Sequence, residues 1–193
     1  VNNMQGLFQF ASAFNNDISS WDVSSVTNLQ DIFMSATEFN NDISLWDISN
    51  SIALNSAFSG ASAFNQDISS WNTSSVKSMN YLFRNAAAFN QDISVWDVSS
   101  VTSMNSLFES ANASFDQTIS AWDVSSVTTM RGMFSYYSSN PNVTSWDVSS
   151  VTDMFRMFFH SPSFDQDLTS CDVSSVTNMS LIHISEPTSP YYP

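Results

Sequence analysis

Apolar residues recur in the first part of each unit of the chain at the spacing of one helix face. In one well-spaced unit they stand at i, i+3, i+4, i+7 and i+10, as Leu29, Ile32, Phe33, Ala36 and Phe39. This spacing is typical of an amphipathic helix. Ser24, Ser25 and Thr27 come just before it, where hydroxyl side chains cap free backbone N–H groups. We predict one helix of about ten residues per unit, too short to be stable without its neighbours.

A shorter apolar segment forms the second part of each unit. Ile18, Trp21 and Val23 combine β-branched and aromatic side chains, which favour a brief strand. If every unit contributes one such strand in the same direction, the strands form a parallel sheet along one side of the molecule, with the helices on the other.

Aromatic residues show that the unit repeats along almost the whole chain. All six tryptophans are spaced by 25, 25, 25, 26 and 24 residues: Trp21, Trp46, Trp71, Trp96, Trp122 and Trp146. Cys171 takes the next place in this column. Two phenylalanine columns follow the same period: Phe8, Phe33, Phe58, Phe83, Phe108, Phe134 and Phe158, and then Phe14, Phe39, Phe64, Phe89, Phe115 and Phe164. Such a period is the signature of a solenoid in which neighbouring units bury one another's apolar faces.

The sequence therefore predicts an α/β solenoid of about seven units over residues 1–179, with one short parallel strand and one short helix per coil. Val1 lies inside a unit, so we expect a fragment of a longer protein, without end caps. Residues 180–193 lack the repeat and contain three of the five prolines. Their stretch LIHISEPTSPY resembles a translated sequencing adapter, and we interpret this tail as an artefact of sequence assembly.

The string FNQDISSWNTSSVKSMNYLFRNAAAF, residues 64–89, is similar to the repeat of BspA-like leucine-rich-repeat surface proteins. That group was once catalogued as a mycoplasma lipoprotein-associated repeat of unknown function. The shared motif FNxDIxxWDVSSVTxMxxLF recurs seven times. The resemblance implies a leucine-rich-repeat-like solenoid on a secreted or surface-displayed protein, often used for attachment. It carries no catalytic residues over to this chain.

Charge limits the classes of partner. The chain has 18 acidic and 4 basic residues, a net charge of −14, and only 11% charged residues. A nucleic-acid backbone would be repelled, so we expect no nucleic-acid partner. No apolar run approaches the ~18 residues of a membrane span, and none is expected. A single cysteine forms no disulfide within the chain.

Two aspartate columns are the candidates for chemistry. The first is Asp17, Asp42, Asp67, Asp92 and Asp167. Stacked carboxylates can hold Ca²⁺, but the same residues also hold turns by bonding to nearby backbone, and the absence of a glycine-rich calcium loop favours the turn. We therefore expect no cofactor, with Ca²⁺ as the alternative. The second column, beside the tryptophans, is expected to face solvent or a basic partner: Asp22, Asp47, Asp97, Asp123, Asp147 and Asp172.

Two further columns are candidates for a binding face. The residue before each tryptophan varies within a fixed frame, as recognition requires and as an unconstrained exposed position also allows: Ser20, Leu45, Ser70, Val95 and Ala121. A row of hydroxyls could bind ice or glycans or belong to ordinary turns: Ser19, Ser44, Ser69, Ser94, Ser120, Thr144 and Thr169.

No catalytic set is visible, because His160 and His183 stand in unrelated contexts and Cys171 fills a core position. The sequence thus favours a non-enzymatic extracellular or cell-surface module that recognises a protein or glycan. The alternatives are a structural repeat that associates end to end through its open edges, and then an ice-binding solenoid.

Overall fold

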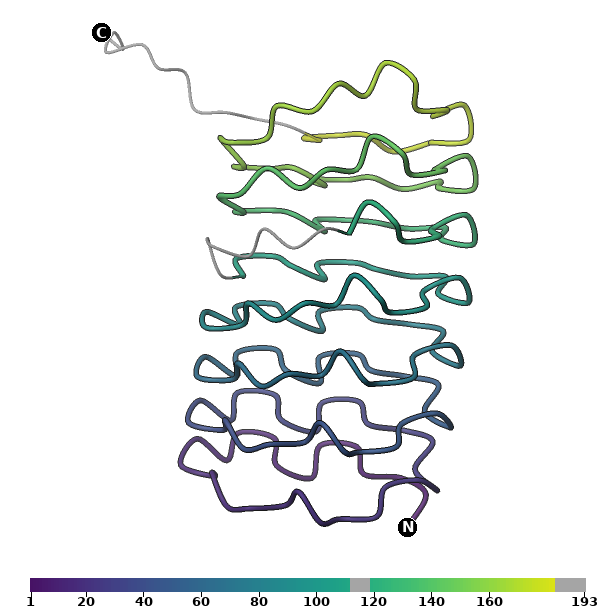
Figure 1. The fold of residues 1–193 in the computed structure, drawn as a ribbon. Coiled ribbons are helices and arrows are strands. Elements are labelled where there is room, and N and C mark those ends of the chain that lie inside the picture. The colour runs from purple at the N-terminus through teal and green to yellow at the C-terminus, as the bar shows by residue number, and fades with distance from the viewer. Residues whose placement is uncertain (112–118, 183–193) are drawn as a thin grey trace, which may run out of the picture.

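The computed structural model describes residues 1–111 and 119–182, which wind into a stack of similar coils, with the first and the last described residues at opposite ends of the stack (Figure 1). Single parallel bridges join each coil to the next: Asn3–Asn28, Asn28–Ala53, Ala53–Ser78, Ser78–Ser103, Ser103–Thr129, Thr129–Asp153 and Asp153–Asn178. We number the coils from these residues: coil 1, 3–27; coil 2, 28–52; coil 3, 53–77; coil 4, 78–102; coil 5, 103–128; coil 6, 129–152; coil 7, 153–177.

The predicted fold class, a leucine-rich-repeat-like α/β solenoid with a helix and a strand in every coil, is wrong. The described residues contain no helix, and their only β-structure is the isolated bridges. A chain of tight turns, here called the turn segment, stands where the helix was predicted and occupies the first eight residues of a coil, as in 53–60 of coil 3. The predicted strand around Trp21 is likewise made of turns and unpaired backbone.

Left-handed backbone at two positions per coil prevents a helix. In coil 3, Ser56 and Gly60 have φ of 53° and 70°. Each is the third residue of a turn closed by a bond between residues i and i+3: Ala57 N–H donates to the Leu54 carbonyl (3.1 Å) and Ala61 N–H to the Phe58 carbonyl (3.0 Å). Positive φ at that place is the mark of a type II turn, whereas a right-handed helix needs negative φ throughout.

Alternate backbone N–H groups of the turn segment tie neighbouring coils together. Leu54, Ser56 and Phe58 donate to carbonyls of coil 4 over 3.1, 2.8 and 3.0 Å. The N–H groups of Ala57 and Ser59 close turns within the coil by donating to the Leu54 and Ser56 carbonyls. Some backbone N–H groups therefore form hydrogen bonds within their own coil, and others form them with the next coil. The backbone can be buried in this way without a helix or a continuous strand.

The interior is a continuous stack of aromatic rings. Seven phenylalanines of the first column, from Phe8 to Phe158, lie over one another with ring centroids 5.6–6.0 Å apart. The second column packs beside it, with Phe33 and Phe39 centroids 3.8 Å apart. Phe115 lies outside the described residues. Buried aromatic pairs contribute about 0.5–1.5 kcal/mol each beyond their burial. The predicted phenylalanine columns are thus confirmed where they are described.

Each inner tryptophan also anchors its coil to the previous one. The indole N–H of Trp71 donates to the Ile43 carbonyl (3.1 Å), and that of Trp96 to the Ile68 carbonyl (3.1 Å). Cys171 leaves this position underfilled, beside an apolar cavity of about 240 Å³ that is also lined by Trp146 and Phe158. Burial and nearby Asp167 raise the pKa of the Cys171 thiol.

The bonding pattern of the coils continues to the last described residues. Arg156 N–H donates to the Ser180 carbonyl (3.1 Å), and Phe158 N–H donates to the Ile182 carbonyl (2.7 Å). Most of the predicted tail, residues 183–193, lies outside the described part of the chain. Within that described part, no helix is long and apolar enough to cross a membrane.

Candidate functional site

The first aspartate column forms turns. In Asp17, Asp42, Asp67 and Asp92, Oδ1 accepts the backbone N–H two residues later over 2.9 Å. The backbone N–H and then the hydroxyl of Ser69 lower the pKa of Asp67, although the neighbouring Asp92 and Asp42 carboxylates act in the opposite direction. This is the turn geometry weighed at the sequence level. The described residues contain no group of three or more His, Cys, Asp or Glu side chains arranged to hold a metal ion.

The second aspartate column has the same turn geometry and is exposed. Asp22, Asp97, Asp123 and Asp147 each accept both the hydroxyl (2.6 Å) and the backbone N–H (3.0–3.1 Å) of the serine two residues later. Asp47 accepts the backbone N–H of Ser49 over 3.0 Å. The serine hydroxyls and then the backbone N–H groups lower the pKa of these carboxyls.

The variable residues before the tryptophans are exposed beside that column. Leu45 and Val95 are 84% and 69% exposed, and Ser20, Ser70 and Ala121 are exposed as well. Ser70 Oγ donates to the Ser44 carbonyl one coil earlier (2.7 Å). Three cavities of the described residues, which are lined by Tyr81, by Cys171 and by Trp21, do not include this column.

A different surface varies far more from coil to coil. The second, fifth and sixth residues of the coils are Leu, Ile, Met, Ala or Phe in coils 1–7, and in coils 2–7 they point into the core. The third, fourth, seventh and eighth residues point away from it, and we call the surface they form the turn face. In coil 3 they are Asn55, Ser56, Ser59 and Gly60, and in coil 7 they are Phe155, Arg156, Phe159 and His160. One backbone thus displays different chemistry in each coil.

A shallow cavity of about 210 Å³ lies on the turn face of coils 4–7. Gly132 and Ser135 are buried in its lining, together with partly buried Asn105, Ser106 and Glu109. Its exposed lining comprises Tyr81 and Tyr136, which are 41% and 52% exposed, and two arginines, Arg131 and Arg156. Large side chains from three coils therefore surround a polar floor made of small ones.

Guanidinium groups and aromatic rings alternate beside this cavity. The Arg131 guanidinium lies 4.7 Å from the Phe155 ring centroid, and that of Arg156 lies 5.1 and 4.8 Å from the Phe155 and Phe159 centroids. The Tyr136 ring stacks on His160 with centroids 5.2 Å apart. Such contacts hold a guanidinium in place while leaving its N–H groups to face solvent.

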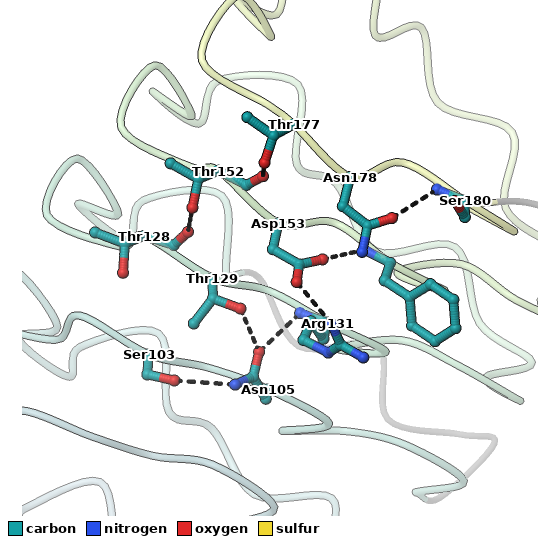
Figure 2. A network of polar contacts seen from close by, with 11 residues as sticks. Ser103, Asn105, Thr128, Thr129, Arg131, Thr152, Asp153, Thr177, Asn178 and Ser180 are labelled. Carbon is teal, nitrogen blue, oxygen red and sulfur yellow. Dashed lines mark hydrogen bonds and ion pairs between the residues drawn. The ribbon is translucent and has the colours of Figure 1, made fainter.

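Figure 2 shows how Arg131 is fixed between coils. Its Nη1 donates to Asp153 Oδ2 (2.7 Å), and its backbone N–H donates to Asn105 Oδ1 (2.9 Å). Burial raises the pKa of Asp153, but the Phe155 N–H and Arg131 together lower it below its ordinary value. A second ion pair joins Arg84 to Glu109 (3.2 Å). Among the described residues, no carboxylate lies within ion-pair distance of Arg156.

The sequence reasoning did not find this site. The arginines entered only through the count of four basic residues, and His160 was interpreted as unrelated to any catalytic set. The signal was present: Arg84, Arg131 and Arg156 all stand between core positions of a repeat that was otherwise aligned correctly.

Comparison with known proteins gives a family but no activity. No curated protein and no solved structure matches the chain. One family matches in three overlapping segments, residues 2–116, 39–138 and 92–187, as expected for a sequence that repeats itself. The chain therefore belongs to the family described as "Mycoplasma protein of unknown function, DUF285".

Proposed function

We propose that this protein is a non-enzymatic recognition module that binds its ligand through the turn face of coils 4–7. One observation carries the proposal: side chains change from coil to coil on that face, while the core beneath it stays nearly constant. A constant scaffold with variable outward residues is how repeat proteins build binding surfaces. The cavity among Tyr81, Arg131 and Arg156 supplies the aromatic and guanidinium groups that dominate binding energies.

We further propose that the module acts in adhesion outside the cell. The motif FNxDIxxWDVSSVTxMxxLF resembles that of BspA-like surface proteins, and this resemblance supports surface display. The composition agrees with such a place, since Ser, Thr and Asn carry most of the polar surface and few charges are present.

Bead adhesion tests this function. Beads coated with the protein are expected to bind to surfaces carrying glycans or matrix proteins. A turn-face variant replaces Tyr81, Arg131, Tyr136 and Arg156 with Asn, which tolerates left-handed backbone. A control variant replaces Ser20, Leu45, Ser70 and Val95 with Asn. Loss of adhesion in the first variant alone supports the proposal, whereas equal loss in both, or no adhesion by the unmodified protein, contradicts it.

A further inference from the structure

We propose that the cavity on the turn face binds an anionic saccharide, with a sugar carboxylate held by Arg156. The inference rests on the proposed function and names its ligand class. Three guanidinium groups surround this surface, from Arg84, Arg131 and Arg156, but Glu109 and Asp153 already pair with the first two. Arg156 is left to bind a carboxylate from outside, at a cluster of three guanidinium groups that locally opposes the repulsion expected from the net charge of −14. Its planar fork matches a carboxylate, with two parallel N–H···O bonds.

The remaining cavity residues fit a sugar ring. Tyr81 and Tyr136 line the cavity and are 41% and 52% exposed, and the C–H face of a pyranose can pack on a tyrosine ring, although one face of the Tyr136 ring already stacks on His160. The floor offers the hydroxyl of Ser106, the Glu109 carboxylate oxygen that is not paired with Arg84, and one N–H of the Asn105 amide, whose oxygen already accepts hydrogen bonds from Thr129 and Arg131. Together these groups both donate hydrogen bonds to sugar hydroxyls and accept hydrogen bonds from them. A cavity of about 210 Å³ admits a small group rather than a large apolar ligand.

Backbone geometry argues against a peptide as the ligand. An extended peptide is usually bound by adding a strand to free N–H and C=O groups at an edge. Here the N–H groups of Ser106, Gly132 and Arg156 already donate to carbonyls of the next coil over 2.7, 2.8 and 3.1 Å. The turn face therefore presents side chains and no free strand edge, which suits a ligand rich in hydroxyl groups.

Backbone strain points to the same residues. Tyr81, Tyr136 and Arg156 have φ of 59°, 54° and 57°, in the left-handed region that bulky side chains avoid. Coils 2 and 3 place Asp, Ser or Gly at the corresponding positions, whereas coil 1 also has a bulky residue at one of them, Phe10 (φ 61°). The fold thus does not require bulky residues there. Residues kept against backbone preference gather where function needs them.

Calorimetric titration of the full chain at physiological salt tests the inference. The probe is hexagalacturonate, a chain of sugar acids, and four others separate the alternatives: its neutral methyl ester, a sulfated neutral hexasaccharide, inorganic sulfate and hexaglutamate. We expect binding of hexagalacturonate, and at least tenfold weaker binding of the other probes.

Variants locate the binding. Arg156→Asn keeps a residue that accepts left-handed backbone, so it is expected to fold, and it should weaken hexagalacturonate binding about tenfold or more. Lys77→Gln removes one positive charge from outside the cavity and should change the affinity less than twofold. Circular dichroism of both variants checks the fold.

Each other outcome overturns the inference. Tighter binding of the sulfated sugar would mean that the site recognises a sulfate and not a carboxylate. Equal binding of hexaglutamate would mean that it recognises an acidic peptide. An equal effect of the Arg156→Asn and Lys77→Gln variants would mean that only the overall charge of the protein affects binding. If hexagalacturonate does not bind but bead adhesion still depends on the turn face, the ligand class is wrong and the proposed function stands. If neither is seen, both are wrong.

Discussion

The turn face of coils 2 and 3 differs from that of coils 4–7 in side chains and hardly at all in backbone. In coils 2 and 3 the left-handed positions hold small or turn-forming residues: Asp31, Ser35, Ser56 and Gly60, with φ of 53–70°. In coils 4–7 half of these positions hold large side chains: Tyr81, Tyr136, Arg156 and His160, with φ of 51–59°. The same turns are therefore formed in coils 2 and 3 by residues that readily adopt left-handed backbone, and at half of the positions in coils 4–7 by residues that disfavour it.

This difference shows that the fold requires left-handed backbone at these positions but tolerates side chains that disfavour it. Left-handed backbone costs about 1–2 kcal/mol for a residue with a Cβ, and less for Asn, Asp or Gly. In coils 4–7 this cost is offset by the common core, because the phenylalanine stack and the bonds between coils are the same in both regions. Four predictions follow the comparison from the core outward.

The largest effect is expected from the core, and it should be equal in the two regions. Phe58→Ala in coil 3 and Phe134→Ala in coil 6 each remove a fully buried ring that stacks on both neighbouring coils. Each should lower the free energy of unfolding by about 3–5 kcal/mol. Urea unfolding followed by tryptophan fluorescence measures it. A much smaller loss for Phe134→Ala would show that coils 4–7 do not share the same core.

The period and the core could be predicted from the sequence, but the local structure could not. Stacked aromatic columns depend only on spacing along the chain, which the residue positions state directly. Leu29, Ile32, Phe33 and Ala36 have helical spacing, yet two successive type II turns bury the same positions. The positions of the glycines distinguish successive type II turns from a helix. Gly6, Gly60 and Gly132 are all the glycines of the chain, and each has left-handed backbone.

The second effect concerns those glycines. A Cβ at Gly60 would lie 3.2 Å from Ser35 Oγ, and one at Gly132 would lie 3.2 Å from Ser106 Oγ, and both residues have left-handed backbone. Gly60→Ala and Gly132→Ala should therefore each destabilise the protein by about 1–2 kcal/mol. Thermal unfolding measured by circular dichroism compares them. If Gly132→Ala were neutral, the backbone of coils 4–7 would be more adaptable than that of coils 2 and 3.

The third effect separates stability from binding. Tyrosine disfavours the left-handed backbone that Tyr81 adopts. Its one described contact with a charged group is with the Arg84 guanidinium, 5.8 Å from the ring centroid. Tyr81→Asn should raise the free energy of unfolding by about 0.5–1 kcal/mol. It should also weaken hexagalacturonate binding, because one wall of the cavity is lost. Ser56→Asn, at the same position in coil 3, should change stability by less and binding not at all.

The candidate site could be anticipated only in part, because it depends on which positions share a face. The variable column with Ser20, Leu45 and Val95 was interpreted either as a recognition surface or as an unconstrained exposed position, and its residues are exposed. The turn face could not be predicted, because a helix would place the third, fourth, seventh and eighth residues of a coil on different surfaces from those that the turns give them. Arg131 and Phe155 stand 24 residues apart, and only the stacking of coils brings them together.

The smallest effect is expected on the aspartate columns, where most coils are alike. The hydroxyl and then the backbone N–H of Ser99 lower the pKa of Asp97, so its charged form is favoured in the folded state. That stability is present above the ordinary aspartate pKa of about 3.9 and is lost as pH falls through the lower folded pKa. Asp97→Asn should therefore lower Tm slightly at pH 7 and match the unmodified protein near pH 2.

Asn72 shows why this effect should be small. It replaces aspartate in coil 3 and still accepts the Ser74 hydroxyl (2.7 Å) and backbone N–H (3.2 Å). An amide therefore keeps the turn and loses only the added strength of a charged acceptor. Asn72→Asp should raise Tm at pH 7 by even less, because Asp47 and Asp97 stand in the same column of the neighbouring coils. A large effect of either change, or one independent of pH, would mean that the aspartates do more than hold turns, and binding on this face would then have to be reconsidered.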